Sequence, residues 1–306
     1  MQRTNKYLLW LLAPLLLAAC ERDFNIEVDM GPPRLIVEAY VNNLLPLYNY
    51  VVLSRSQDYY SADLDNVPVS GATVTITEGT VQADRSIRWD TANRAVMQEL
   101  ALPRFDLSLL PGVYLDRRLA NTPNRALIGK PGKSYLLEIE ESGKKYSAIT
   151  TIPQPVPIDS LTNGNVFLEY DDDGVGMYKS RITVHFQDPD TIGNAQLYFW
   201  RHQDNRAYFG WGGMHTNRFT PNTDEKVNGE YLHITHSNGF ALTDTVVYYL
   251  ASVERKVYNF WDSYNKARDN GGPFSTPVNL LSTIQGPDVI GSFSGFGMST
   301  KTHVVQ

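Results

Sequence analysis

The chain has 306 residues, a formal net charge of −6 at pH 7 and a single cysteine. The acidic balance argues against a nucleic-acid partner, because proteins that bind nucleic acid present clustered Lys and Arg to the phosphates. One cysteine excludes a disulfide within the chain, so the fold has to be stabilised by burial of apolar surface.

The first nineteen residues have the order of a secretory signal peptide. Arg3 and Lys6 give a positive start, residues 7–17 form an apolar run, and small residues lead to Cys20. The run is shorter than the ~20 apolar residues of a membrane-spanning helix. Leu17-Ala18-Ala19-Cys20 resembles a bacterial lipobox, in which the cysteine carries lipid. We therefore predict a signal peptide over residues 1–19 and anchoring in membrane lipid through Cys20; the alternative is a buried helix with an incidental cysteine.

The next part of the sequence predicts a tether followed by an all-β domain. Residues 20–33 are mostly polar and end in Gly31-Pro32-Pro33, which is typical of a spacer. From Arg34 onwards, β-branched and aromatic segments alternate with turn residues. We expect an immunoglobulin-like or transthyretin-like β-sandwich over residues 34–152, with strands at 35–41, 50–54, 72–77, 134–140 and 145–151.

Three prolines at positions 153, 155 and 157 predict a domain boundary, because they cannot continue a central strand. A second β-rich domain is expected over residues 153–306, with one α-helix near 250–268. The helix is predicted from apolar residues at three- and four-residue steps and ends before Gly271-Gly272-Pro273; its apolar stripe should pack on a sheet. The predicted fold class is thus mostly β, with two β-sandwich domains in tandem, and the strands expected in the second domain are 179–186, 195–202, 230–236, 244–252 and 299–305.

Motifs for catalysis and for metal binding are weak. Asp171-Asp172-Asp173-Gly174 is the densest carboxylate cluster, but consecutive side chains point in different directions, so we interpret it as a solvated turn and not as a calcium site. His233 and His236 fall in a predicted strand, where residues three apart face opposite sides. Ser292 and Ser294 do not match G-x-S-x-G. We predict no catalytic residue, metal or cofactor; a triad assembled from distant residues remains the hydrolase alternative.

One aromatic segment stands out as a candidate ligand site. Tyr208, Trp211 and His215 lie among glycines between two predicted strands. Aromatic side chains on such a loop suit a small molecule, a glycan, a peptide or a protein partner. The competing interpretation is that Phe209 and Trp211, two residues apart, form the inward face of a strand.

Several segments, in the same order along the chain, resemble the Bacteroidetes outer-membrane lipoprotein family known as domain of unknown function 4249. They are the lipobox and residues 35–41, 53–60, 69–76, 150–160, 257–261, 272–280, 284–286, 291–293 and 299–302. The chain departs from the family at Ala39, where glycine is more common. The resemblance implies an accessory partner of a TonB-dependent outer-membrane transporter, and it transfers no catalytic or ligand residue.

The resemblance also bears on location. Glu21-Arg22-Asp23 is similar to signals that send such lipoproteins to the cell surface, which favours the surface over the periplasmic face. The functional hypothesis is a non-enzymatic, lipid-anchored outer-membrane protein that helps a TonB-dependent transporter to recognise or take up a ligand. A structural or adhesive envelope protein is the alternative, and a hydrolase is less favoured.

Overall fold

β-Strands make up most of the regular structure in the computed structural model, which describes residues 33–57, 67–105, 107–171, 173–203, 220–223, 227–235, 239–270 and 278–306. The mostly β fold class predicted from the sequence is therefore confirmed. Residues 33–306 belong to one compact unit. None of the described helices has the length and apolar character needed to cross a bilayer.

Strands and short helices alternate through the first half of this unit. They are β1 (Leu35–Asn42), η1 (Pro46–Tyr48), β2 (Tyr50–Arg55), β3 (Thr73–Val81), β4 (Ile87–Trp89), η2 (Thr91–Asn93), β5 (Ala95–Glu99), η3 (Pro103–Phe105), β6 (Val113–Asp116), α2 (Arg118–Asn121), η4 (Pro123–Arg125), β7 (Ser134–Glu141) and β8 (Lys144–Thr151). The second half contains β9 (Ser160–Tyr170), β10 (Gly176–Gln187), β11 (Ala195–His202), β12 (Thr220–Thr223), β13 (Tyr231–Thr235), β14 (Phe240–Ala241), β15 (Thr245–Ser252), α3 (Arg255–Asp269) and β16 (Val289–Val304).

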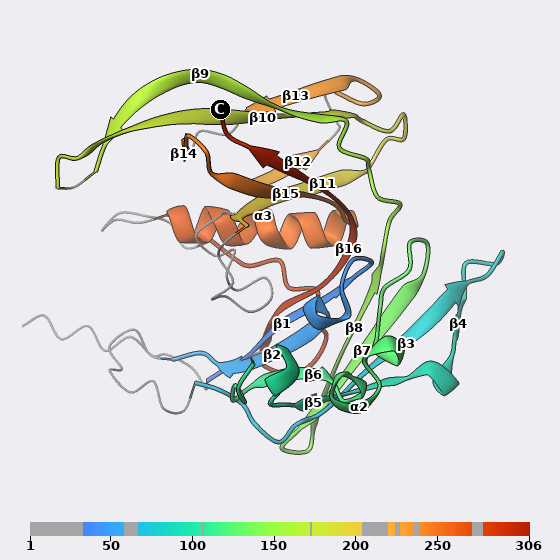
Figure 1. The fold of residues 1–306 in the computed structure, drawn as a ribbon. Helices are drawn as coiled ribbons and strands as arrows, with labels where there is room; N and C mark the ends of the chain where they lie inside the picture. The colour runs from blue at the N-terminus through green and yellow to red at the C-terminus, as the bar shows by residue number, and fades with distance from the viewer. Residues whose placement is uncertain are drawn as a thin grey trace, which may run out of the picture. The chain divides into compact units, whose positions relative to one another are not determined.

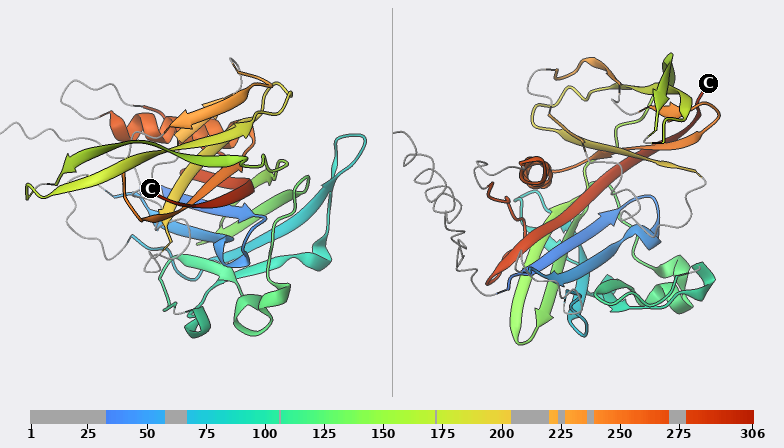
Figure 2. Two further views of the ribbon diagram at one scale, coloured as in Figure 1. Left: turned by 45° about the horizontal axis from the view of Figure 1, so that its top comes forward. Right: turned by 90° about the vertical axis from the view of Figure 1, so that its left-hand side faces the viewer.

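The strands form two sheets, and the long strand β16 runs through the middle of the larger one. The order of the larger sheet is β12-β11-β15-β16-β1-β2-β6-β5-β3-β7-β8, with β4 attached to β3. The first half of β16 pairs in parallel with β1, and the second half pairs antiparallel to β15. Figure 1 and the right-hand view of Figure 2 show β16 extending from the first strands of the unit to the last ones.

The smaller sheet packs on one part of the larger sheet. Its strand β10 pairs with β9 on one side and with β13 and β14 on the other. Ile182, Val184 and Phe186 point from β10 into a core shared with Trp200 and Tyr248 of the larger sheet. Burying each such side chain contributes about 1.5–3 kcal/mol, so this two-layer contact holds the smaller sheet in place.

Helix α3 packs against the larger sheet as its apolar stripe predicts. Val257 and Trp261 are buried in a core that includes Tyr40 and Phe296, and the Trp261 indole Nε1 donates a hydrogen bond to Ser294 Oγ at 3.2 Å. The predicted start of the helix was wrong. Leu250 belongs to β15 and the helix begins at Arg255. The prediction failed because residues 246–253 are mostly apolar, and such a run fits the periodicity of a helix as well as that of a strand.

Most predicted strands are present with small shifts of their ends. The strand predicted at 195–202 has the bounds of β11, whereas the closing strand predicted at 299–305 starts ten residues earlier, at Val289. The boundary predicted after residue 152 follows the end of β8. The division into tandem domains stays a prediction, and β16 carries backbone pairing across that point.

Candidate functional site

The residues predicted from the sequence as sites lie outside the described residues. Cys20 falls in 1–32, and Tyr208, Trp211 and His215 fall in 204–219. Lipidation and ligand binding at these positions therefore stay predictions. Trp200, in the strand that precedes these aromatic residues, lies in β11 and is buried, so it belongs to the core.

The β9–β10 hairpin exposes a row of apolar side chains, which we call the apolar strip. Leu168 and Tyr178 are register partners, and Tyr170 pairs with Gly176; partners in an antiparallel ladder point to the same face of the sheet. A Cβ at Gly176 would lie 3.1 Å from the Tyr170 ring and 3.2 Å from Leu168 Cδ1, so these side chains close over the glycine. The strip consists of Val166, Leu168, Tyr170 and Tyr178, which are 50%, 43%, 65% and 61% exposed.

The strip lies where the hairpin extends beyond β13. β13 pairs with β10 over Thr183–Gln187 and β14 pairs at Lys179 and Ser180, so among the described strands residues 176–178 pair with β9, and the Leu242 backbone N–H also donates to the Tyr178 carbonyl at 3.3 Å. Figure 1 shows β9 and β10 curving out past β13 and β14. An apolar strip on a projecting strand pair is typical of a surface that contacts another molecule.

The turn of the hairpin is acidic and held by local hydrogen bonds. Asp171 Oδ1 accepts from the backbone N–H groups of Asp173 at 3.1 Å and Val175 at 2.7 Å, and Gly174 has a φ of 77°. Both are features of a turn closed by an aspartate side chain. This geometry agrees with the solvated turn predicted from the sequence.

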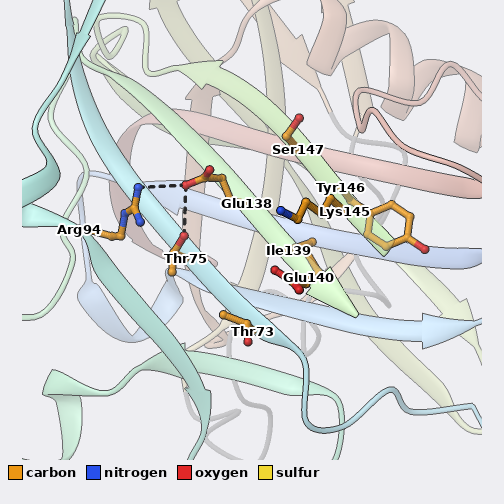
Figure 3. Close-up of a pocket in the computed structure, with 9 residues that line it drawn as sticks. All are labelled: Thr73, Thr75, Arg94, Glu138, Ile139, Glu140, Lys145, Tyr146 and Ser147. Atoms are coloured by element: carbon orange, nitrogen blue, oxygen red, sulfur yellow. Dashed lines mark hydrogen bonds and ion pairs between the residues drawn. The ribbon is translucent and has the colours of Figure 1, made fainter. Parts of the chain in front are cut away.

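A second candidate is an open polar groove of about 400 Å³ across β3, β7 and β8. Figure 3 shows Arg94, Thr75 and Glu138 turned toward one another, with Lys145 and Glu140 further along. Arg94 lies 3.3 Å from the Glu138 carboxylate, and both side chains are nearly half exposed. Solvent screening leaves such a pair worth about 0–1 kcal/mol, so the groove offers a ligand weakly held charges.

A third candidate is an apolar pocket of about 220 Å³ beside α3, lined by Ile36, Phe260, Trp261, Tyr264, Leu280 and Ile290 among others. Glu38 lies in its wall and accepts a hydrogen bond from the Tyr40 hydroxyl at 2.6 Å. Burial, reinforced by the Glu38 carboxylate, raises the Tyr40 pKa well above its usual value, so the phenol stays a neutral donor. The volume is below the ~300–1,000 Å³ of ordinary ligand pockets.

The serines that the sequence singled out have structural contacts. Ser292 and Ser294 are buried in β16, with their hydroxyls 3.0 Å apart, and Ser294 receives the Trp261 indole N–H. The next histidine, His303, contacts Asn163. These contacts place the serine hydroxyls in the packing of α3 on β16.

The fold is mostly β, with one packed helix of 15 residues and a hairpin that carries exposed apolar side chains. A family model described as "Domain of unknown function (DUF4249)" matches residues 21–302, and the chain belongs to this family. This agrees with the family resemblance of the sequence segments.

Two further comparisons add little. No curated protein matches the chain. Among solved structures, the chain is similar to one titled "Cytokine receptor complex - Crystal form 1A", with 9% sequence identity over 88% of this chain and 95% of that one. The TM-score is 0.20, which is too low to carry an argument about fold or function.

Proposed function

We propose that this protein is a lipid-anchored outer-membrane accessory protein that docks on a TonB-dependent transporter through the apolar strip. The observation that carries the proposal is the exposure of Leu168, Tyr170 and Tyr178 on one face of the projecting β9–β10 hairpin. Tyrosine and leucine at such a position supply large apolar area, and tyrosine is enriched among residues that dominate binding energy. The lipobox ending at Cys20 and the family resemblance support the anchor and the partner.

The proposed role is binding and not catalysis, at the cell surface. Three observations support this. The strip offers area for a protein partner, while the serines Ser292 and Ser294 are engaged in core packing. The acidic residues Glu21 and Asp23 after the lipobox support surface exposure. We propose Tyr208, Trp211 and His215, predicted from the sequence, as the residues that bind a ligand, whether small molecule, glycan or peptide.

The tandem arrangement of two sandwiches belongs to the same proposal. It is supported by two of the three apolar clusters: one draws on residues 35–152 together with Ile284 and Phe293, and another draws on residues 156–250 together with Val305. The third cluster, which includes Tyr40, Phe199 and Trp261, joins residues of both halves. In this arrangement, the smaller sheet and its hairpin belong to the second sandwich.

The test is affinity purification of a C-terminally tagged chain from native outer membrane in mild detergent, followed by quantitative mass spectrometry. The expected result is one TonB-dependent barrel in near-equal amount. The variant Leu168→Ser/Tyr178→Ser should reduce its recovery about tenfold or more, since loss of central contacts costs over 1 kcal/mol each.

The matched control is Leu109→Ser/Ile192→Ser, which removes two exposed apolar side chains from other surfaces and should leave recovery unchanged. A lipoprotein recovered without any barrel would reject the accessory role and favour a structural or adhesive one. Equal loss of the barrel in both double variants would reject the apolar strip as the docking surface.

A further inference from the structure

Two histidines from different parts of the sequence meet on the smaller sheet. His185 of β10 and His233 of β13 are register partners, and their Nδ1 atoms are 2.6 Å apart. The rings are nearly perpendicular, with centroids 4.8 Å apart. His233 is exposed and His185 is half-buried, so the two Nδ1 atoms converge at a place that solvent reaches.

We propose that His185 and His233 form a binding site for a divalent copper ion. Imidazole nitrogen is a preferred ligand of Cu(II), Ni(II) and Zn(II). Metal–nitrogen bonds of ~2.0–2.1 Å to two atoms at the observed separation enclose an angle of roughly 80° at the metal. That angle is close to the right angle between neighbouring ligands of tetragonal Cu(II) and far from the tetrahedral angle of zinc sites.

The remaining coordination positions would go to water. Within the described residues, no group of three His, Cys, Asp or Glu side chains is placed to hold a metal, so the pair has no third protein ligand of these types there. The hydroxyls of Thr183 and Thr235, 2.7 Å apart, occupy the next row of the same two strands. A site with two protein ligands on a surface binds a metal reversibly and leaves positions for a further ligand.

The number of protons on the two rings is compatible with metal binding. The Nδ1–Nδ1 contact requires that one of the two nitrogens carries a proton. When both Nδ1 atoms bind the metal, that proton moves to Nε2 of the same ring, and no net proton is released from a neutral pair. In His185 the Nε2–H then donates to Thr162 Oγ1, which lies 2.7 Å away. A hydrogen bond of this kind fixes the ring of a metal-bound histidine.

Metal binding uses the neutral form of both rings, in which each ring offers one nitrogen lone pair to the metal. This inference does not depend on the proposed function, because it uses a different surface of the protein.

The test is a Cu(II) titration of the full-length protein in detergent. Calorimetry measures the affinity and the stoichiometry, and electron paramagnetic resonance identifies the ligands of the bound Cu(II). We expect one tightly bound Cu(II) per chain with two imidazole nitrogens in its spectrum. His185→Asn and His233→Asn should each weaken binding on the order of 100-fold and leave one nitrogen. Thr162→Val, which removes only the supporting hydrogen bond, should weaken it about tenfold.

The control variants carry changes at the other histidines. His202→Asn and His303→Asn alter histidines with different neighbours, and His215→Asn/His236→Asn alters two that lie outside the described residues; all three should bind Cu(II) like the unmodified chain. Circular dichroism verifies that each variant is folded. Unchanged affinity and an unchanged spectrum in folded His185→Asn or His233→Asn would overturn the proposal, and so would loss of binding in His215→Asn/His236→Asn.

Discussion

The backbone carbonyl of Val37 occupies the space where a side chain on Gly291 would begin. The two residues are register partners in the parallel pair of β1 and β16, and a Cβ at Gly291 would overlap the Val37 carbonyl. Gly291 also has a φ of 153°. This close approach allows the first half of β16 to pair with β1.

Replacing Gly291 by alanine should destabilise the whole unit. The added methyl meets backbone and not a movable side chain, so β1 and β16 have to separate locally. We expect a loss of at least about 2 kcal/mol in the free energy of unfolding, measured by urea denaturation. Gly164→Ala in β9 is the control, because the nearest atom there is at the ordinary distance of 3.5 Å; a Gly291→Ala protein as stable as this control would contradict the account of the β1–β16 pairing.

A buried carboxylate provides the second prediction. Asp116 is fully buried, and its oxygens accept hydrogen bonds from the Arg118 guanidinium at 2.6 and 2.9 Å and from the Leu127 backbone N–H at 2.6 Å. Asp116→Asn removes the charge that balances Arg118 and places an amide N–H₂ among donors. Since Arg118 is partly exposed, the expected loss is about 2–3 kcal/mol, below the ~3–5 kcal/mol of a fully buried pair.

Glu138→Gln is the matched comparison for Asp116→Asn. The Glu138–Arg94 pair has similar chemistry, but both of its side chains are nearly half exposed. Its removal should cost at most about 1 kcal/mol. The urea midpoints of the two variants are measured side by side. A larger loss of stability in Glu138→Gln than in Asp116→Asn would reject the argument.

Stability should fall as the pH drops below neutral, in part through His303. Burial lowers the pKa of His303 from its ordinary value of 6.5. Between the lowered value and 6.5, the unfolded chain binds more protons than the folded one, so the free energy of unfolding decreases as the pH falls through this window. The free energy of unfolding, measured by urea denaturation at pH 7.5 and 5.5, should change less between the two pH values for His303→Asn than for the unmodified chain.

The carboxylates change the free energy of unfolding at lower pH, outside the interval from pH 7.5 to 5.5 used for His303→Asn. Hydrogen bonds from Ser86 to Asp84, from Asn93 to Asp90 and from Ser142 to Glu141 lower the pKa values of those carboxyl groups. Their contributions to stability are present at and above the ordinary carboxyl pKa values of about 4 and are lost below them. A His303→Asn protein with the full pH dependence between 7.5 and 5.5 would contradict the histidine assignment.

Local sequence patterns were sufficient to predict strands in which apolar and polar residues alternate. They failed where tertiary contacts determine the structure of the segment. β11 and β13 were predicted because their apolar and β-branched residues fit a strand and turn residues bound them. The first half of β16 was missed because Gly291, Gly295 and Gly297 resemble an irregular segment. Side chains at those positions would overlap or crowd the backbone of residues 37, 151 and 153, so the glycines there are a consequence of close packing and not of a loop.

The candidate sites also differ in how much of each could be predicted from local sequence. Val166, Leu168 and Tyr170 alternate along the sequence, which is the pattern of a strand with an apolar face, although no strand was predicted over residues 160–170. Only the structure shows that this face is exposed. The His185–His233 pair had no signal at all, because its members are 48 residues apart. Only strand register brings them together, whereas the sequence invites comparison of His233 with His236.

The anchor predicted at Cys20 can be tested independently of any partner. Cys20→Ala removes the only thiol, so cells grown with a radiolabelled fatty acid should label the unmodified chain and leave the variant unlabelled. The membrane attachment of the variant should also weaken, because the acyl chains contribute about 0.8 kcal/mol per buried CH₂ and only the proposed transporter contact remains. Glu21→Gln/Asp23→Asn is the control: it should keep the label but lose accessibility to protease added to intact cells. A Cys20→Ala chain that still incorporates the label would refute lipidation, and a Glu21→Gln/Asp23→Asn chain that is cleaved as before would refute the acidic residues as the surface signal.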